Sequence, residues 1–288
     1  MKDRLIELGY LAGWRVVRAL PLPVAKRLFR TVADRAWKGD GPGTQRLRRN
    51  LRQVVGEDMP ETLVRDALRS YARYWMEAFR LPTQNRAQFL DGFFMVPESY
   101  QKLKKAATDG NGVILALPHV ANWDAAGAWV CSHDWPLITV AERLKPEGVA
   151  RAFLAYREKL GMKVLPHTGG ERSPLEVLTE HLGKGWVVAL LGDRDLSRSG
   201  VEVEFFGGRT RMPGGPALLA IRTGAPIFAV DCWYDERRVM ARMREITPPA
   251  DGPLDERIKR TTQQLADAYA AGIADHPQDW HMLQKLWL

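Results

Sequence analysis

Beyond about residue 93, short runs of apolar residues alternate with stretches whose apolar residues recur every three to four positions. Runs of four to six apolar residues are typical of strands buried on both faces of a parallel sheet, and the longer stretches are typical of helices. The alternation predicts a single α/β domain with a mostly parallel central sheet flanked by helices. Strands are predicted at 112–117, 136–140, 162–165, 186–191, 201–206, 226–230 and 239–243, and helices at 123–131, 147–160, 174–182, 216–223 and 254–274.

The preceding part of the chain has helical periodicity only. Its first two stretches place apolar residues on one helical face and charged residues on the other, which makes them amphipathic. We expect an N-terminal helical, membrane-facing segment at 1–92 and an α/β core at 93–288, within one structural domain overall. The helices are predicted at 4–20, 24–37, 44–55 and 63–79.

Charge is distributed unevenly along the chain. The net charge is +8, whereas residues 1–52 alone carry 13 Lys and Arg against 4 Asp and Glu, a balance of +9. Amphipathic helices with a basic rim bind anionic membrane surfaces, so residues 1–37 are expected to contact such a surface. No uninterrupted apolar run reaches 18 residues, so no spanning helix is expected. The alternative is a helix pair packed on the core. Without zinc-finger spacing or an RNA-binding aromatic signature, nucleic acid is not an expected partner.

Ionisable residues follow the predicted strands at the end where parallel sheets place their reactive groups. His119 comes directly after the strand at 112–117, and Asp124 follows in the first turn of the next helix. A carboxylate that binds one imidazole nitrogen leaves the other free to take a proton near neutral pH. A histidine that only caps the helix is the alternative. The other strand ends carry Glu142-Arg143, His167 and Asp193-Arg194-Asp195.

The acidic cluster at 193–195 offers a second carboxylate for His119. Asp193 can reach the imidazole from a neighbouring strand end, so Asp124 and Asp193 both remain candidates for its support. Arg194, or a backbone amide, can face negative charge that develops during a reaction. A plain set of surface ion pairs is the alternative interpretation of this cluster.

Several common site types do not fit the sequence. There is no Gly-x-Ser-x-Gly elbow for a serine nucleophile and no Gly-x-Gly-x-x-Gly turn for a dinucleotide. Cys131 and Cys232 lie in apolar stretches and are expected to be core residues rather than nucleophiles. The spacing of His119, Asp124 and His167 does not match that of the helical zinc sites, so no metal is expected.

Four motifs in order resemble the glycerolipid, lysophospholipid and lipid A lauroyl/myristoyl acyltransferases. The stretch from Pro118 to Asp124 resembles the family's box of a histidine and an acid separated by four residues, with Asn-Trp inside it as in the lipid A branch. The chain ends differently from the lipid A enzymes, which usually have Trp-x-Trp-x-His. The other three motifs are Tyr156-Arg157 before Leu160-Gly161, Gly192-Asp193-Arg194-Asp195 followed by Val203-Glu204-Phe205-Phe206-Gly207, and His276-Pro277-Gln278-Asp279-Trp280.

Within this family, residues 193–197 and 200–206 resemble the actinobacterial branch that acylates a phosphatidylinositol mannoside glycolipid. The resemblance implies an O-acyltransferase that moves a long-chain acyl group from acyl-CoA to a mannose hydroxyl, without a cofactor. It also implies a peripheral location on the cytoplasmic face of the cell membrane and a membrane glycolipid as acceptor. The implied catalytic residues are His119 as general base with Asp124 and Asp193, and the implied substrate-binding residues are Arg157, Arg194, Asn122, Glu142 and Arg143.

Three rival functions remain open at this point. A lipid A-type acyltransferase would use another glycolipid acceptor. A membrane-associated glycosyltransferase would share the α/β crevice and the paired acids, and would need a sugar nucleotide. A non-catalytic lipid-binding protein would turn over neither donor.

Overall fold

The computed structural model describes residues 2–141, 147–167, 172–195 and 199–288. Its helices are α1 (Lys2–Ala19), α2 (Leu22–Gly39), α3 (Pro42–Val55), α4 (Glu61–Arg80), α5 (Arg86–Gly92), α6 (Pro97–Thr108), α7 (Trp123–Cys131), α8 (Glu147–Lys159), α9 (Pro174–Leu182), α10 (Gly215–Thr223) and α11 (Leu254–Asp275), with 3₁₀ turns η1 (Leu81–Thr83) and η2 (Pro277–Asp279). Its strands are β1 (Phe93–Met95), β2 (Val113–Leu117), β3 (Leu137–Ala141), β4 (Met162–Pro166), β5 (Val187–Leu191), β6 (Val201–Phe205), β7 (Gly208–Met212), β8 (Ile227–Tyr234) and β9 (Val239–Ile246).

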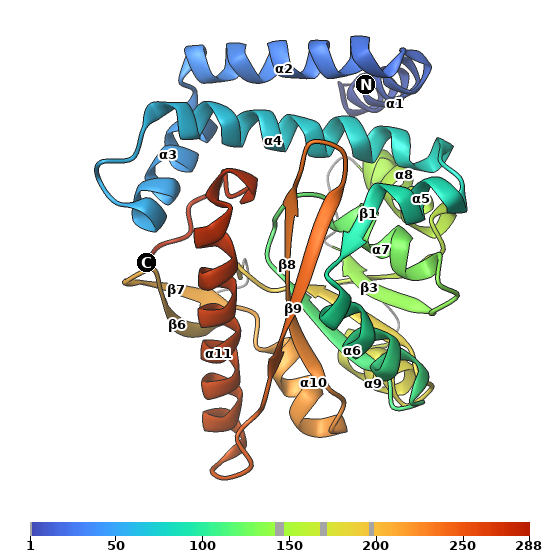
Figure 1. Cartoon of the computed structure of the whole chain (residues 1–288), viewed down its shortest axis with the longest axis vertical. Coiled ribbons are helices and arrows are strands. Elements are labelled where there is room, and N and C mark those ends of the chain that lie inside the picture. The colour runs from blue at the N-terminus through green and yellow to red at the C-terminus, as the bar shows by residue number, and fades with distance from the viewer. Residues whose placement is uncertain (1, 142–146, 168–171, 196–198) are drawn as a thin grey trace.

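The central sheet has the order β1-β9-β8-β2-β5-β3-β4. Strands β8, β2, β5, β3 and β4 are mutually parallel, β9 runs antiparallel to β8, and β1 is parallel to β9. Helices flank this sheet, with α11 alongside β8 and α7 packed near β3 (Figure 1). The predicted α/β domain with a mostly parallel central sheet is therefore confirmed.

Strand β2 lies inside the sheet because its sequence, Val-Ile-Leu-Ala-Leu, offers no polar side chain to solvent, and all five residues are buried. The register pairs Leu117 of β2 with Leu191 of β5, and the Gly192 N–H donates to the Leu117 carbonyl at 2.8 Å. His119 and Asp193 each stand two residues beyond these paired leucines. They therefore leave the sheet side by side, although 74 residues separate them in the chain.

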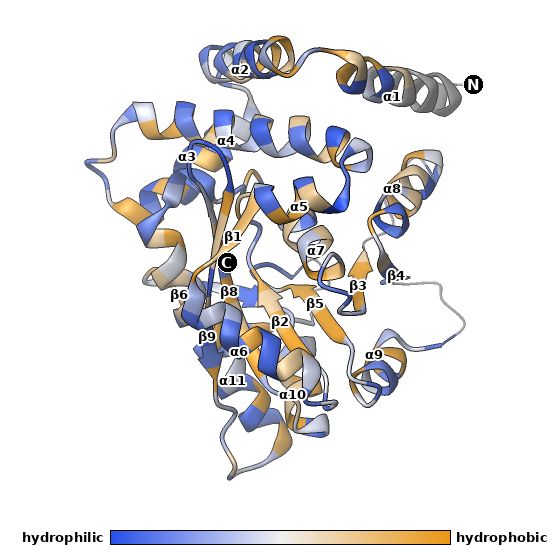
Figure 2. Ribbon diagram, turned by 45° about the vertical axis from the view of Figure 1, so that its right-hand side comes forward, coloured by the Kyte–Doolittle hydropathy of each residue, from blue (hydrophilic) through white to orange (hydrophobic). Residues whose placement is uncertain are grey.

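The N-terminal helices lie across one end of the sheet (Figure 1). Helix α4 is the nearest of them, and α2 packs along it through the fully buried Ala25 and Ala33. Helix α1 is fixed by Trp14, whose indole N–H donates to the Phe79 carbonyl at 2.9 Å. Alternating hydrophilic and hydrophobic colours along α2 reflect its amphipathic sequence (Figure 2). No helix in the described part of the chain is both long and apolar enough to cross a bilayer.

The structure differs from the sequence prediction in elements whose formation depends on distant neighbours. The strand predicted at 201–206 does not join the central sheet: as β6 it pairs with β7 in a separate two-stranded hairpin. Sequence periodicity also missed the short edge strand β1, which is only three residues long and pairs with β9. Helices α5 and α6 were missed because their short, polar sequences carry little apolar periodicity.

Candidate active site

His119 and Asp193 are joined by two hydrogen bonds. The His119 ring contacts Asp193 Oδ1 through Nδ1 at 2.5 Å, and the His119 backbone N–H donates to Asp193 Oδ2 at 2.9 Å. Because an ionised carboxylate only accepts hydrogen bonds, the ring proton is assigned to Nδ1, which leaves a lone pair on Nε2. Nε2 makes no hydrogen bond with the described residues. The His119 side chain is 16% exposed and the Asp193 side chain is fully buried.

Asp193 is held as an anion by the donors around it. Trp280 adds a third hydrogen bond, from its indole Nε1 to Asp193 Oδ2 at 3.0 Å. Burial by itself raises the pKa of Asp193, but the electrostatic interaction with His119 and the hydrogen bonds from His119 and Trp280 outweigh it and lower the pKa below the usual carboxyl value. The preceding residue must be glycine, because a Cβ on Gly192 would lie 2.7 Å from the Tyr269 hydroxyl.

The loop that carries His119 is fixed by the C-terminal segment 279–281. Residue Val120 forms an isolated antiparallel bridge with Trp280. The loop is strained at Ala121, whose φ of 45° lies in the left-handed region, so the contacts with 279–281 must hold it there. Two backbone hydrogen bonds join the segments, from His281 N to His119 O at 2.8 Å and from Ala121 N to Asp279 O at 2.9 Å.

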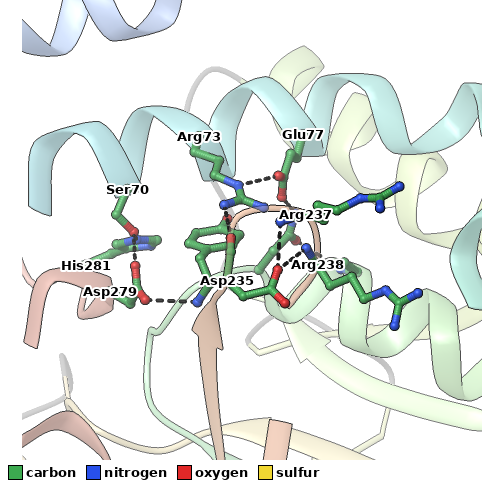
Figure 3. Close-up of polar contacts among 11 residues, drawn as sticks. Ser70, Arg73, Glu77, Asp235, Arg237, Arg238, Asp279 and His281 are labelled. Atoms are coloured by element: carbon green, nitrogen blue, oxygen red, sulfur yellow. Dashed lines mark hydrogen bonds and ion pairs between the residues drawn. The ribbon is translucent and has the colours of Figure 1, made fainter. Parts of the chain in front are cut away.

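Asp279 connects this segment to α4 and to the β8–β9 hairpin. Ser70 on α4 donates its hydroxyl to Asp279 Oδ1 at 2.6 Å, and the Tyr234 backbone N–H donates to Oδ2 at 2.9 Å. Nearby on α4, Arg73 donates to the Asp235 carbonyl in the hairpin turn at 2.7 Å (Figure 3). The histidine loop is thus supported from three parts of the chain that are remote in sequence.

Asp124 does not contact His119, and pairs instead with Arg157. The guanidinium Nε of Arg157 lies 2.7 Å from Asp124 Oδ1, and the Tyr74 hydroxyl donates to Oδ2 at 3.0 Å. Burial lowers the pKa of Arg157, but the charge of Asp124 more than offsets it, so the pKa is raised and the guanidinium stays charged. The structure therefore separates the two carboxylates that the sequence left unranked: Asp193 binds the imidazole, and Asp124 binds Arg157.

A cavity of about 600 Å³ opens beside His119. This volume lies within the range of small-ligand sites. Arg157 and Arg194 both line it, so two of the predicted substrate-binding residues bring positive charge to the same space. Most of the remaining wall is apolar or aromatic, from α4, α8, the start of α7 and the ends of β3, β4 and β5. These residues include Tyr71, Tyr74, Trp75, Trp123, Phe153, Leu154, Val164, Leu165 and Leu191.

The other predicted site residues lie away from this cavity or outside the described residues. Asn122 caps α7 by accepting a hydrogen bond from the Ala125 N–H at 3.0 Å, and its amide donates to Glu77 at 3.0 Å. Asn122 is not among the described residues that line the His119 cavity. Glu142 and Arg143 lie outside the described residues.

Neither cysteine has the setting of a nucleophile. Burial raises the pKa of the Cys131 thiol to about 11 and also raises the pKa of the fully buried Cys232 thiol. In the part of the chain that the structure describes, no three His, Cys, Asp or Glu side chains are grouped so as to hold a metal ion. His167, at the end of β4, is exposed.

Sequence reasoning missed the aromatic surroundings of His119. Trp123 lies edge-on to the His119 ring with centroids 5.3 Å apart, and stacks on Tyr74 at 4.1 Å. In the sequence, Trp280 stood out only as part of the His-Pro-x-x-Trp motif, and nothing indicated that His281 belongs to the site. Both become neighbours of His119 because the chain end returns to β2, a contact that no local pattern indicates.

A histidine that is bound to a buried carboxylate and lines a cavity has the arrangement that general-base catalysis requires. Residues 3–288 match the family described as bacterial lipid A biosynthesis acyltransferases, so the chain belongs to this family and is an acyltransferase. It is 47% identical to the phosphatidylinositol mannoside acyltransferase of Mycolicibacterium smegmatis, covering 99% of this chain and 92% of that protein. It is 45% identical to the phosphatidylinositol mannoside acyltransferase of Mycobacterium tuberculosis, covering 97% of this chain and 88% of that protein.

Proposed function

We propose that this acyltransferase moves a long-chain fatty acyl group from acyl-CoA to a mannose hydroxyl of a phosphatidylinositol mannoside, with His119 as general base. The observation that carries the proposal is the His119–Asp193 pair, whose free Nε2 belongs to a side chain lining a 600 Å³ cavity. The names of the relatives at 45–47% identity support the choice of acceptor. A lipid A-type acceptor remains the second candidate, supported by the family match.

The first step forms the new ester bond. A sugar hydroxyl holds its proton too tightly to react at neutral pH, so Nε2 of His119 takes this proton as the oxygen attacks the thioester carbonyl. The resulting imidazolium is stabilised by Asp193, which remains ionised and keeps the ring in the productive tautomer. Asp193 thus acts as a positioning residue through His119.

The second step expels the thiolate of CoA. The tetrahedral intermediate carries its negative charge on the former carbonyl oxygen, which Arg194 or a backbone amide stabilises. When the carbon–sulfur bond breaks, the imidazolium returns its proton to the sulfur, and free CoA and the acylated glycolipid leave. The sequence of steps needs no metal, no cofactor and no acyl-enzyme. Arg157, held by Asp124, supplies further positive charge for the phosphates of CoA or of the lipid head group.

We further propose that the protein works as a peripheral protein on the cytoplasmic face of the cell membrane. Helix α2 exposes an apolar row of Val24, Leu28 and Val32, which are 50%, 44% and 51% exposed. Their spacing of four residues puts them on one helical face, and the neighbouring Lys26 and Arg27 are exposed as well. An apolar row with adjacent basic residues matches the surface of an anionic bilayer.

Vesicle binding tests the membrane part. Replacing Val24, Leu28 and Val32 together by Ser should weaken binding to phosphatidylglycerol vesicles by about 100-fold. Burying the exposed half of each side chain in the bilayer contributes about 1 kcal/mol to the free energy of binding. Leu254, equally exposed at the start of α11, is the matched control. Equal loss in the Leu254→Ser control, or binding insensitive to salt and anionic lipid, would refute this part.

Product analysis tests the reaction. The wild-type protein is incubated with labelled palmitoyl-CoA and a panel containing phosphatidylinositol mannosides, a lipid A precursor and simple mannosides. The expected product is an acylated mannoside with stoichiometric CoA release, and His119→Ala should lose about 10²–10⁴-fold in turnover while staying folded. His167→Ala is the control, because His167 is an exposed histidine at a neighbouring strand end.

The same assay separates the rival functions. A glycosyltransferase would release no CoA and would instead need a sugar nucleotide. A lipid-binding protein would consume neither donor, and an acyl group trapped on any side chain would contradict direct attack by the acceptor.

A further inference from the structure

Two buried polar atoms beside His119 have no hydrogen-bond partner among the described residues. One is the indole Nε1 of Trp123, which can only donate, and the other is Nδ1 of His281. Both side chains line the His119 cavity, and their ring centroids lie 6.1 Å apart. Buried groups of this kind are almost always paired in folded proteins, so a missing partner points to a ligand.

The hydrogen bonds of His281 make its Nδ1 an acceptor. Ser70 donates its hydroxyl to Asp279, so the Ser70 oxygen is free to accept from His281 Nε2, which lies 3.0 Å away (Figure 3). Burial is the main cause that lowers the pKa of His281, to about 3, so the ring is neutral at physiological pH. With the single ring proton on Nε2, Nδ1 carries only a lone pair.

The unpaired donor and the unpaired acceptor both lie next to the reacting base. The Trp123 ring is 5.3 Å from the His119 ring, centroid to centroid. The backbone N–H of His281 donates to the carbonyl of His119 at 2.8 Å, which fixes the two histidines side by side. The contact of Ser70 with His281 Nε2 at 3.0 Å holds the His281 ring, and the stacking of Tyr74 at 4.1 Å holds Trp123.

We infer that Trp123 and His281 together bind one hydroxyl group of the acceptor, adjacent to the hydroxyl that His119 activates. A hydroxyl suits the pair because one oxygen accepts from the indole N–H and donates to the imidazole lone pair. This inference rests on the proposed acyl transfer to a glycolipid and adds which group of the acceptor the site recognises. A sugar supplies neighbouring hydroxyls, so the pair selects a polyol over a simple alcohol.

Such a pair rejects acceptors that lack the second hydroxyl. When that hydroxyl is absent, both polar atoms stay buried and unpaired, and sites built to bind a hydroxyl discriminate strongly for this reason. The Trp123→Phe substitution keeps an aromatic ring against Tyr74 and removes the N–H donor. The His281→Phe substitution removes the acceptor and also the contact with Ser70.

The kinetic test uses labelled palmitoyl-CoA with octyl α-D-mannoside and its four monodeoxy analogues. Trp123→Phe should lower kcat/KM for the parent mannoside by about 10–100-fold, as for a lost hydrogen bond to a buried group. On the one analogue that lacks the bound hydroxyl, wild type and Trp123→Phe should be equal. Trp135→Phe, in the same core but away from the cavity, is the control. The analogue that lacks the reacting hydroxyl is not acylated, and an equal loss on every acceptor that is acylated would mean a purely structural role and would overturn the inference.

A binding test decides the same point without turnover. In the His119→Ala protein, the indole N–H resonance that disappears in Trp123→Phe should shift downfield when octyl α-D-mannoside is added. The inference is overturned if the mannoside binds without moving this resonance, if Trp123→Phe leaves its Kd unchanged, or if it does not bind. Failure of wild-type protein to acylate any acceptor would instead refute the proposed function, and the titration would still decide whether the pair binds a hydroxyl.

Discussion

Replacing Asp193 by Asn tests the central pair because it exchanges one acceptor oxygen for an NH₂ donor of nearly the same size. Three N–H groups converge on this carboxylate: His119 Nδ1 on Oδ1, and the His119 backbone and Trp280 Nε1 on Oδ2. An amide satisfies the two donors at the Oδ2 position only by placing its oxygen there. Its NH₂ group then faces His119 Nδ1.

This arrangement changes the tautomer of the His119 ring. Nδ1 has to accept a hydrogen bond, so the ring proton moves to Nε2, and Nε2 can no longer take the proton of the acceptor hydroxyl. Loss of a general base lowers the rate by about 10²–10⁴-fold, which corresponds to about 2.7–5.4 kcal/mol in the activation free energy. Loss of a charge-assisted hydrogen bond also lowers the free energy of unfolding by about 1.5–3 kcal/mol.

The assay measures kcat with palmitoyl-CoA and a phosphatidylinositol mannoside, together with the free energy of unfolding in urea. Asp195→Asn is the matched control, because Asp195 lies two residues away and accepts a hydrogen bond from the Gly200 N–H instead. A folded Asp193→Asn protein with near wild-type kcat would refute the role of Asp193. So would a fall in kcat no larger than that of the control.

Three further outcomes follow from other contacts. Arg157→Ala should lower the free energy of unfolding by about 3–5 kcal/mol because it leaves Asp124 buried without its cation, and urea denaturation that shows less than 1 kcal/mol would contradict this. Ala121→Gly should raise the free energy of unfolding slightly, by about 0.5 kcal/mol, because glycine removes the strain at φ 45° but makes the unfolded chain more flexible; a lower free energy of unfolding would show that the loop is unstrained. His281, with its pKa near 3, should destabilise the protein as pH falls from about 6.5 towards 3, since the unfolded histidine binds a proton that the buried one does not. His281→Phe should remove this contribution to the acid destabilisation, and identical pH profiles would contradict it.

The local sequence pattern was sufficient to predict the strands and helices that carry the site. The uninterrupted apolar sequence of β2 is incompatible with an exposed strand, and the alternation of such runs with amphipathic stretches leaves a parallel sheet as the consistent arrangement. Because reactive groups gather at the carboxyl ends of parallel strands, the position of His119 after β2 already marked it as the leading candidate. These inferences hold because burial and periodicity are properties of consecutive residues.

The identity of the carboxylate beside His119 was decided only in three dimensions. Asp124 is five residues away in sequence, but its place in the first turn of α7 directs it to Tyr74 and Arg157. Asp193 reaches His119 because β2 and β5 are neighbours whose register pairs Leu117 with Leu191. Strand order and register depend on how the whole core packs, and no local pattern encodes them.

The sequence by itself thus determined the fold class, the family and the position of His119 at a strand end. The tertiary structure decided which residues surround this histidine: Asp193 from the end of a neighbouring strand, and Trp280 and His281 from the C-terminal segment. The physical reason is that periodicity and motif order are local, whereas the hydrogen bonds that set a tautomer and leave Trp123 and His281 each with one unpaired polar atom are made between segments far apart in the chain.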